Sequence, residues 1–289
     1  MRLWYDKPSS KGTNILRPAP SEDNTWQQHT LPIGNGDLGA NVYGEIVCER
    51  LTFNEKTLWT GGPCADRPDY NGGNLEECGK NGETMKKIQA LFAAGDSNAA
   101  SELCNELIGA NDDGYGAYQS WGNLYFDSMD LTEEVSDYVR DLDLTTAVAS
   151  VKFSHKGTDY TREFFISHPD NVLVGRLTAT GAAPLNVDVR FVSNQECPTV
   201  ALGTTLEQTG RVRDNQMQFA ACLSAVAEGG SVIPDGDKLT VRGASALTVY
   251  LSAATDYKNE YPAYRTGESA EDLHARVRAA SLAASKKHY

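Results

Sequence analysis

Hydrophobic and polar residues alternate with a period of two through most of the chain after about residue 145. The segments 185–191 and 217–223 alternate strictly, which predicts strands that have one buried face and one face in water. Shorter runs of the same kind, separated by turn signals such as Gly157 and Gly236, lie at 148–153, 160–166, 172–177, 239–241 and 247–253. Many short antiparallel strands at this spacing predict a β-sandwich.

A helical period replaces this alternation between about residues 83 and 108. Apolar residues recur there every three or four positions, and Gly95 divides the segment into two parts. The first part presents Met85, Ile88, Leu91 and Phe92 on one face, and the second presents Ala100, Leu103, Cys104 and Leu107. The pattern predicts a helical hairpin inserted between strands.

A further helix is predicted near the end of the chain. Ser269 and Asp272 resemble a capping box, and an apolar stripe of helical spacing follows at Leu273, Val277, Ala280 and Ala284. Neither glycine nor proline ends the pattern before Tyr289, so we interpret it as the beginning of a linker helix that continues beyond this chain.

A glycine-rich turn, an alternating segment and a polar loop follow one another in residues 31–63. Gly34, Gly36 and Gly39 match the G-x-G-x-x-G spacing of dinucleotide-binding folds, but that fingerprint needs a helix after the glycines. Here residues 40–48 alternate between apolar and polar, which predicts a strand instead. The glycines are therefore interpreted as a tight turn that leads into a β-strand.

The loop at 54–63 and the segment 115–122 combine amide, carboxylate, hydroxyl and aromatic groups, a mixture typical of sugar-binding sites. The candidate substrate-binding residues are Asn54, Glu55, Trp59, Thr60, Tyr118 and Gln119. An alternative stays open, in which Trp59 packs in the core and Asn54 and Glu55 satisfy the backbone of the turn. The aromatics of 115–122 could likewise anchor the glycine-, tyrosine- and aspartate-rich loop at 111–121.

Composition describes a protein able to bury a large core, as one β domain or two smaller ones. The chain has 289 residues, of which 40% are hydrophobic, and its net charge of −13 disfavours nucleic acid as a partner. No apolar run is long enough to cross a membrane, and residues 1–10 lack the pattern of a signal peptide. A cytoplasmic location is favoured, while secretion after removal of a signal peptide stays open.

No catalytic, cofactor or metal motif is visible. The six cysteines include no C-x-x-C pair and no Cys/His group with zinc spacing, and nucleophile-elbow, H-E-x-x-H and P-loop motifs are missing. The neighbouring acids Asp112–Asp113 and Glu133–Glu134 offer pairs of carboxylates of the kind that glycosidases use, but such pairs on loops are more often solvated surface. We therefore assign no catalytic residue, metal or cofactor.

Six segments in order resemble a known family. They read LWYDKP, LPIGNGDLGANVYGE, LTFNEKTLWTGGP, YGAYQSWGNLYFD, LDLTTAVASVKF with YTREFFISHPDNVLVGRL, and LSAATDY. Together they resemble the N-terminal domain of glycoside hydrolase family 95, the α-L-fucosidase type, whose N-terminal domain is of the family 65-like kind. The resemblance implies a mainly β fold, with a β super-sandwich over residues 1–265, the start of a helical linker at 266–289 and a catalytic (α/α)6 barrel that this chain lacks.

The resemblance also limits what this chain is expected to do. In the family, an inverting reaction is carried out by a glutamic acid and by water-positioning asparagine and aspartate residues, all in the barrel. It implies that the barrel of the same polypeptide is the partner, that a fucosylated oligosaccharide is the substrate, and that the isolated chain is inactive. Whether the sugar is an α-L-fucoside or an α-L-galactoside stays open. The alternative is an autonomous carbohydrate-binding module.

Overall fold

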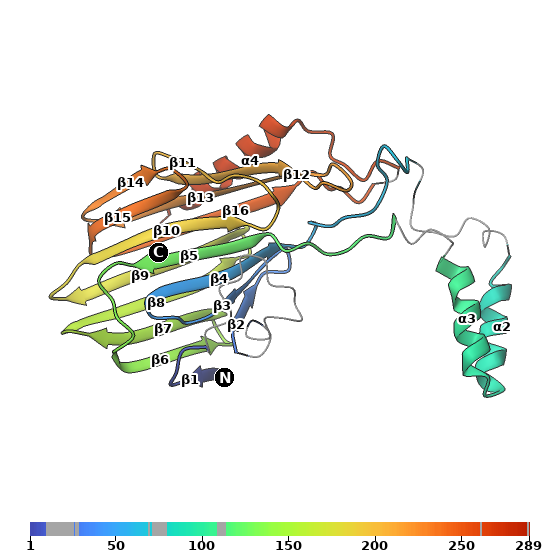
Figure 1. Cartoon of the computed structure of the whole chain (residues 1–289), viewed down its shortest axis with the longest axis horizontal. Helices are drawn as coiled ribbons and strands as arrows, with labels where there is room; N and C mark the ends of the chain where they lie inside the picture. The colour runs from blue at the N-terminus through green and yellow to red at the C-terminus, as the bar shows by residue number, and fades with distance from the viewer. Residues whose placement is uncertain are drawn as a thin grey trace.

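The computed structural model of the chain describes residues 1–9, 26, 29–68, 70, 80–108, 114–260, 262–287 and 289. Within these residues, two antiparallel sheets stack face to face (Figure 1). The nine-stranded sheet contains, in spatial order, β1 (Arg2–Tyr5), β6 (Ser136–Asp143), β7 (Val148–His155), β8 (Thr158–Ser167), β9 (Val172–Gly181), β16 (Ala246–Thr255), β13 (Gln218–Glu228), β12 (Thr205–Arg211) and β11 (Val200–Leu202). The seven-stranded sheet contains β14 (Ser231–Asp235), β15 (Lys238–Ala244), β10 (Leu185–Ser193), β5 (Gly122–Ser128), β4 (Cys48–Glu55), β3 (Leu38–Val42) and β2 (Leu31–Gly34).

The glycine-rich segment forms a β-hairpin. Gly34 ends β2 and pairs with Gly39 of β3, and Gly36 between them has φ +96°. The Asn35 Oδ1 atom accepts hydrogen bonds from the backbone N–H groups of Asp37 (2.9 Å) and Leu38 (2.8 Å), which fixes the turn. A strand follows the glycines, as predicted, and the geometry of a dinucleotide loop is excluded.

The strand predicted over residues 40–48 is interrupted. β3 ends at Val42, and residues 43–47 form a bend before β4 begins at Cys48. The bend reverses the phase of the alternation, so Glu49 points into the protein, where it is 0% exposed, and Cys48 moves to the outer face, where it is only half-buried. The prediction of one continuous strand over residues 40–48 was therefore wrong.

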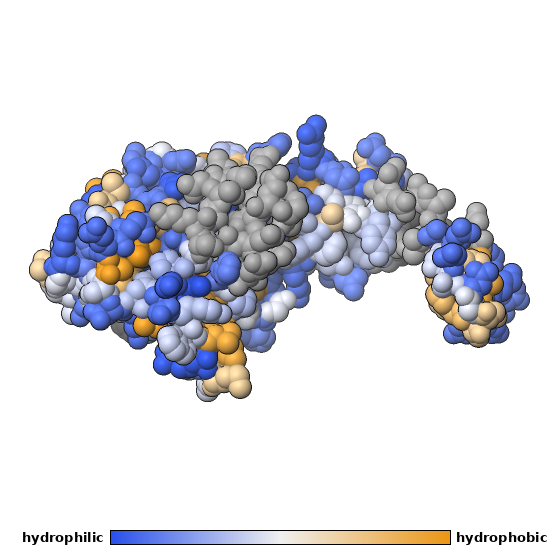
Figure 2. Space-filling view, turned by 60° about the horizontal axis from the view of Figure 1, so that its bottom comes forward, coloured by the Kyte–Doolittle hydropathy of each residue, from blue (hydrophilic) through white to orange (hydrophobic). Residues whose placement is uncertain are grey.

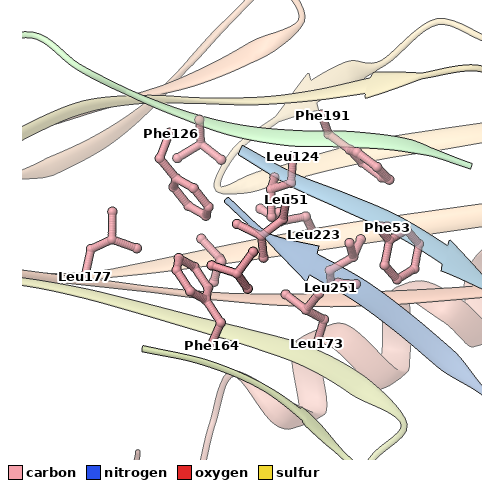
Figure 3. Close-up of a cluster of buried hydrophobic side chains, with 14 of the residues drawn as sticks. Leu51, Phe53, Leu124, Phe126, Phe164, Leu173, Leu177, Phe191, Leu223 and Leu251 are labelled. Carbon is pink, nitrogen blue, oxygen red and sulfur yellow. The ribbon is translucent and has the colours of Figure 1, made fainter. Parts of the chain in front are cut away.

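The core lies between the two sheets. Leu51 and Phe53 of β4 and Leu124 and Phe126 of β5 are fully buried, as Figure 3 shows. They face Phe164, Leu173, Leu177, Leu223 and Leu251 from the nine-stranded sheet. Burying a Leu or Phe side chain stabilises a fold by about 1.5–3 kcal/mol, so this cluster holds the sheets together and fixes the loops at their ends.

One ion pair crosses this apolar core. The Arg162 guanidinium of β8 lies 3.2 Å from the Glu49 carboxylate of β4, and the two side chains are 3% and 0% exposed. Glu49 Oε1 also accepts hydrogen bonds from the backbone N–H groups of Gly44 (2.8 Å) and Arg50 (3.1 Å). Arg162 donates in turn to the carbonyl oxygens of Glu45 and Ile46. The pair thus links the bend before β4 to the opposite sheet.

Helix α4 (Ala270–Ala284) packs against the outer face of the nine-stranded sheet. Leu273 and Val277 form a buried cluster with Ala220 and Cys222 of β13. Because of this helix, both faces of β13 are buried, so the prediction of one wet face for 217–223 was wrong. The predicted cap is confirmed, since Ser269 Oγ accepts a hydrogen bond from the Asp272 N–H at 3.1 Å.

Helices α2 (Glu83–Ala93) and α3 (Ser97–Ile108) form the predicted hairpin between β4 and β5. The two helices pack on each other, and Figure 1 draws them well apart from the sheets. Figure 2 shows hydrophobic and hydrophilic atoms side by side on the hairpin surface, and Met85 and Phe92 are exposed. The predicted fold class, mainly β with a helical hairpin and a C-terminal helix, is confirmed.

Candidate functional site

Two loops at one end of the sandwich form a short ladder. Backbone N–H groups of Thr60, Gly62 and Gln119 donate to the carbonyl oxygens of Ala117 (3.0 Å), Gly114 (2.9 Å) and Leu58 (2.9 Å). The loops approach closely at Gly116, which has φ +85° and where a Cβ atom would stand 2.0 Å from the Thr60 carbonyl oxygen. Only glycine fits such a position.

The polar candidates on these loops bond to the loops themselves. Asn54 donates from Nδ2 to the Gln119 carbonyl oxygen (2.7 Å) and accepts at Oδ1 from the Trp121 N–H (3.1 Å). Thr60 Oγ1 accepts from the Ala117 N–H (2.8 Å), and Gln119 Nε2 donates to the Ala117 carbonyl oxygen (3.0 Å). These three side chains therefore fix the shape of the loops.

Glu55 has the same local role. Its Oε2 atom accepts hydrogen bonds from the Thr57 N–H (2.9 Å) and from Thr57 Oγ1 (2.6 Å), and the residue is buried. Burial raises the pKa of this carboxyl group, and the bonds from Thr57 oppose that rise. Asn54 and Glu55 form hydrogen bonds with backbone groups of the loops, as the alternative interpretation proposed. The same interpretation placed Trp59 in the core, and this part is wrong because Trp59 is exposed.

Trp59 and Tyr118 present an aromatic surface to solvent. Their rings lie 5.3 Å apart between centroids, and the side chains are 44% and 50% exposed. Trp59 Nε1 donates to the Lys56 carbonyl oxygen at 2.9 Å, which fixes the orientation of the indole. Burial raises the pKa of the Tyr118 phenol. Such rings can cover the apolar face of a sugar.

A pocket of about 560 Å³ opens beside Trp59, and we call it the loop pocket. Its lining is rich in aromatic residues and draws on four separate parts of the chain. The lining residues are Lys56, Thr57, Trp59, Thr60, Gly61, Gly62, Pro63, Tyr70, Gly114, Tyr115, Asn215, Met217, Tyr257, Tyr264 and Arg265. A volume of this size accommodates a small ligand.

The turn before β13 holds the loop pocket together. Asn215 Nδ2 donates to the carbonyl oxygens of Trp59 (3.0 Å) and Gly61 (2.8 Å). Asp214 Oδ2 accepts from the Gly61 N–H (2.6 Å) and from Arg67 (2.5 Å). Burial alone would raise the pKa of Asp214, but the bonds from Arg67 and Gly61 outweigh it and lower the pKa.

The segment after β16 supplies the opposite wall. Tyr257 pairs with Arg265 in an isolated bridge, and Arg265 donates to the Asn215 carbonyl oxygen at 3.3 Å. Sequence reasoning missed these residues and Asn215. The one available signal was the tyrosine-rich stretch at 257–264, which lies far from the 54–63 loop in sequence.

The described residues include no metal-binding group and no acidic pair that lines the loop pocket. None of them form a group of three His, Cys, Asp or Glu side chains that could hold a metal ion. Glu133 and Glu134 are exposed and are absent from the lining of the loop pocket, while Asp112–Asp113 fall outside the described residues. No helix among the described residues is long and apolar enough to cross a membrane.

Two stacked antiparallel sheets that carry an aromatic, loop-built pocket define a β-sandwich domain. The family model "Glycosyl hydrolase family 65, N-terminal domain" matches residues 3–260. The chain belongs to this family, and the similarities below confirm its resemblance to the N-terminal domain of the α-L-fucosidase type.

Two similar proteins are named as fucosidases. Alpha-L-fucosidase 2 of Arabidopsis thaliana is 31% identical over 283 residues, which cover 86% of this chain and 32% of the relative. A probable alpha-fucosidase A of Aspergillus niger is 34% identical over 177 residues, which cover 61% of this chain and 21% of the relative. This chain thus spans about a third or less of the length of these relatives.

A solved structure supports the fold. A putative kojibiose phosphorylase from the human microbiome superposes with a TM-score of 0.55 and 8% identity, and the match covers 100% of this chain and 36% of that protein. At this identity the likeness concerns the fold alone.

Proposed function

We propose that this chain is the non-catalytic N-terminal domain of an inverting glycoside hydrolase that acts on α-L-fucosides or α-L-galactosides in oligosaccharides. In this proposal the domain packs on a catalytic (α/α)6 barrel of the same polypeptide, and the loop pocket forms one edge of the sugar cleft. The domain range of 1–265, the linker start at 266–289 and a cytoplasmic location belong to the same proposal.

The observation that carries this proposal is the exposed aromatic pair Trp59–Tyr118, of which Trp59 lines the loop pocket. Soluble proteins seldom leave two adjacent large aromatic rings exposed on a loop fixed by so many hydrogen bonds unless the rings contact a partner or ligand. The fucosidase names of the relatives support the substrate class, and the share of their length that this chain covers supports a separate catalytic domain.

Steady-state kinetics of the full-length protein test the cleft-edge role. We expect Trp59→Ala to raise KM for a fucosylated oligosaccharide about tenfold, or about 1.4 kcal/mol, because one stacking surface is lost. The kcat value should stay within about twofold, because the acid and the water-positioning groups lie elsewhere. An unchanged KM would contradict the role of this loop.

Trp4→Ala is the matched control. Trp4 is 64% exposed on the edge strand β1 and does not line the loop pocket, so the substitution removes an even more accessible indole elsewhere. We expect unchanged kinetics. Comparison of α-L-fucosides with α-L-galactosides in the same assay decides the sugar, and no turnover of either would refute the substrate class.

The isolated 289-residue chain is expected to hydrolyse neither substrate. The carboxylates of Glu55 and Asp214, which neighbour lining residues of the loop pocket in sequence, accept local hydrogen bonds. Turnover by the purified chain that survives removal of contaminating glycosidases would refute the non-catalytic assignment.

The loop pocket also favours a second candidate, an autonomous carbohydrate-binding module. Tyr115 and Trp59 in its lining are 72% and 44% exposed without the barrel, so they are accessible to a sugar in the isolated chain. Calorimetric titration of the isolated chain with fucosylated oligosaccharides separates the two candidates. Binding that Tyr115→Ala abolishes would favour the module, and no binding at the loop pocket would favour the domain that acts only with its barrel.

A further inference from the structure

A second pocket, of about 530 Å³, lies on the outer face of the seven-stranded sheet, and we call it the sheet pocket. It is formed mainly by the outward side chains of β3, β4 and β5 and by the segment before β5. The lining residues are Trp26, Pro32, Ile33, Gly39, Ala40, Asn41, Tyr43, Arg50, Thr52, Phe53, Asn54, Tyr118, Ser120, Asn123 and Asn194. The described lining contains four asparagines and no carboxylate.

Asn123 leaves a buried donor unpaired in this pocket. The residue is 1% exposed, and its Oδ1 atom accepts hydrogen bonds from Arg50 Nε (2.8 Å) and Thr52 Oγ1 (3.0 Å). Because Arg50 Nε can only donate, the amide orientation is fixed and Nδ2 is the remaining atom. Nδ2 has no hydrogen-bond partner in the part of the chain that the structure describes.

Asn194 leaves a buried acceptor unpaired in the same pocket. Its Nδ2 atom donates to Ser120 Oγ at 2.9 Å, and its Oδ1 atom has no partner among the described residues. Each buried polar group without a partner costs about 1–3 kcal/mol. Three buried side-chain atoms of the described residues lack a partner, and two of them line this one pocket. The sheet pocket therefore presents one unpaired donor and one unpaired acceptor, which a ligand could satisfy.

The single charged group of the lining is held by neighbouring side chains. Arg50 is the only charged side chain among the described lining residues, and its guanidinium lies 4.6 Å from the centre of the Tyr43 ring and donates to Asn123. A donor and an acceptor held beside an exposed Tyr118 ring match the hydroxyl groups and apolar face of a sugar. Tyr118 contacts Trp59, so the sheet pocket adjoins the loop pocket.

We propose that the sheet pocket binds one or two neutral sugar rings, with Asn123 Nδ2 donating to one hydroxyl group and Asn194 Oδ1 accepting from another. The choice of a sugar rests on the proposed glycosidase function, whereas the position and polarity of the site rest on the two unpaired amide atoms. Loop-pocket residues such as Tyr115 and Tyr257 take no part in this contact.

The test is calorimetric titration of the 289-residue chain with fucosyllactose, lactose and glucuronate. We expect fucosyllactose or lactose to bind and glucuronate not to bind. Asn123→Asp keeps the acceptor for Arg50 and Thr52 but replaces the unpaired donor with an acceptor, so it should weaken binding at least about tenfold without lowering the melting temperature. Asn194→Ala should weaken binding as well.

Tyr115→Ala is the matched control, because Tyr115 is exposed and lines only the loop pocket. It should leave the affinity unchanged. Binding that Tyr115→Ala abolishes and Asn123→Asp spares would overturn the proposal and place the sugar in the loop pocket. Absence of binding to either neutral sugar would also overturn it.

A last comparison separates this proposal from the proposed function. If Asn123→Asp destabilises the full-length protein but leaves the isolated chain unchanged, and no sugar binds, the unpaired amides contact the barrel and the sugar site is wrong, while the domain assignment stands. If the isolated chain binds neutral sugars as described but the full-length protein hydrolyses no fucoside or galactoside, the proposed function fails and the sheet pocket stands.

Discussion

Replacing Arg162 with methionine is the sharpest test of how the two sheets are joined. The guanidinium lies 3.2 Å from Glu49 in a site where both side chains are at most 3% exposed. At an effective dielectric constant of about 20, a pair at this distance attracts by about 5 kcal/mol. Removing one partner leaves a buried carboxylate, and the carbonyl oxygens of Glu45 and Ile46 lose a donor.

We expect Arg162→Met to lower the free energy of unfolding by about 3–5 kcal/mol at pH 7, as for other buried pairs that lose one member. Urea unfolding followed by the fluorescence of the buried Trp121 measures this change. Arg276→Met is the matched control, because its pair with Glu268 is at the surface and Arg276 is 52% exposed. Arg276→Met should lower the free energy of unfolding by less than about 1 kcal/mol.

The pH dependence checks the physical cause. Burial raises the pKa of Glu49, and Arg162 and the N–H groups of Gly44 and Arg50 oppose the rise. Without Arg162 the folded-state pKa rises further above the unfolded value of about 4.3, so the folded state binds more protons between the two values. Stability then falls as pH rises through that window. The deficit of Arg162→Met should therefore be smaller at pH 5 than at pH 8.

Two results would refute this reasoning. One is a decrease of less than about 1 kcal/mol in the free energy of unfolding, with an unchanged dependence on urea concentration. This result would mean that the Arg162–Glu49 pair contributes no more than a surface pair. The other is a deficit that grows as the pH is lowered, because an uncompensated carboxylate must become less costly once it is protonated.

Three further outcomes follow from single positions. Gly116→Ala should cost about 1–3 kcal/mol in thermal unfolding, because its methyl group would meet the Thr60 carbonyl oxygen; an unchanged melting temperature would refute the tight approach. Trp121→Ala should cost about 3–5 kcal/mol in urea unfolding, because a fully buried ring is lost, and a loss below about 1 kcal/mol would contradict its core position. Burial alone would raise the pKa of Glu207, but hydrogen bonds from Thr205 and from Arg278 and His274 of α4 outweigh burial and lower the pKa. The protection of α4 amides against hydrogen exchange, relative to the intrinsic rate at each pH, should therefore fall below about pH 4. Glu207→Gln should remove this pH dependence, and its persistence would refute the role of Glu207.

Local pattern was sufficient where the physical signal is local. The alternation after residue 145 predicted β7, β8, β9, β10, β13, β15 and β16 but missed the strands β11, β12 and β14. The period of three to four predicted α2 and α3, and Ser269 predicted the start of α4. Each of these signals acts within one turn or one strand, so the residues that decide the element are neighbours in sequence.

The alternation of apolar and polar residues gave wrong predictions where segments distant in sequence decide whether a residue is buried. The bend at 43–47 shifts Glu49 into the core, where its charge is compensated by Arg162 from the other sheet. The alternation of β13 predicted that its second face is in water, but that face is buried. The residues that cover it, Leu273 and Val277, belong to a helix about fifty positions later in the chain. No local signal reports such a partner.

The candidate site was also predicted only in part from the sequence. Sequence singled out the loops around Trp59 and Tyr118 because their residue types suit sugar binding, and the structure brings these two rings together. It placed Asn54, Glu55, Thr60 and Gln119 in hydrogen bonds that shape the loops, and it added Asn215, Tyr257 and Arg265 to the loop pocket. The contact of the six candidates with a sugar stays a prediction.

The sequence by itself determined the strand-rich fold, the helical hairpin, the capped last helix and the family resemblance, because these are carried by periodicity, capping and ordered motifs within short segments. Only the tertiary structure decided which polar groups are already paired and which, like Asn123 Nδ2 and Asn194 Oδ1, find no partner among the described residues. The physical reason is that hydrogen-bond satisfaction depends on neighbours across strands and sheets, and a linear sequence does not show which residues will meet.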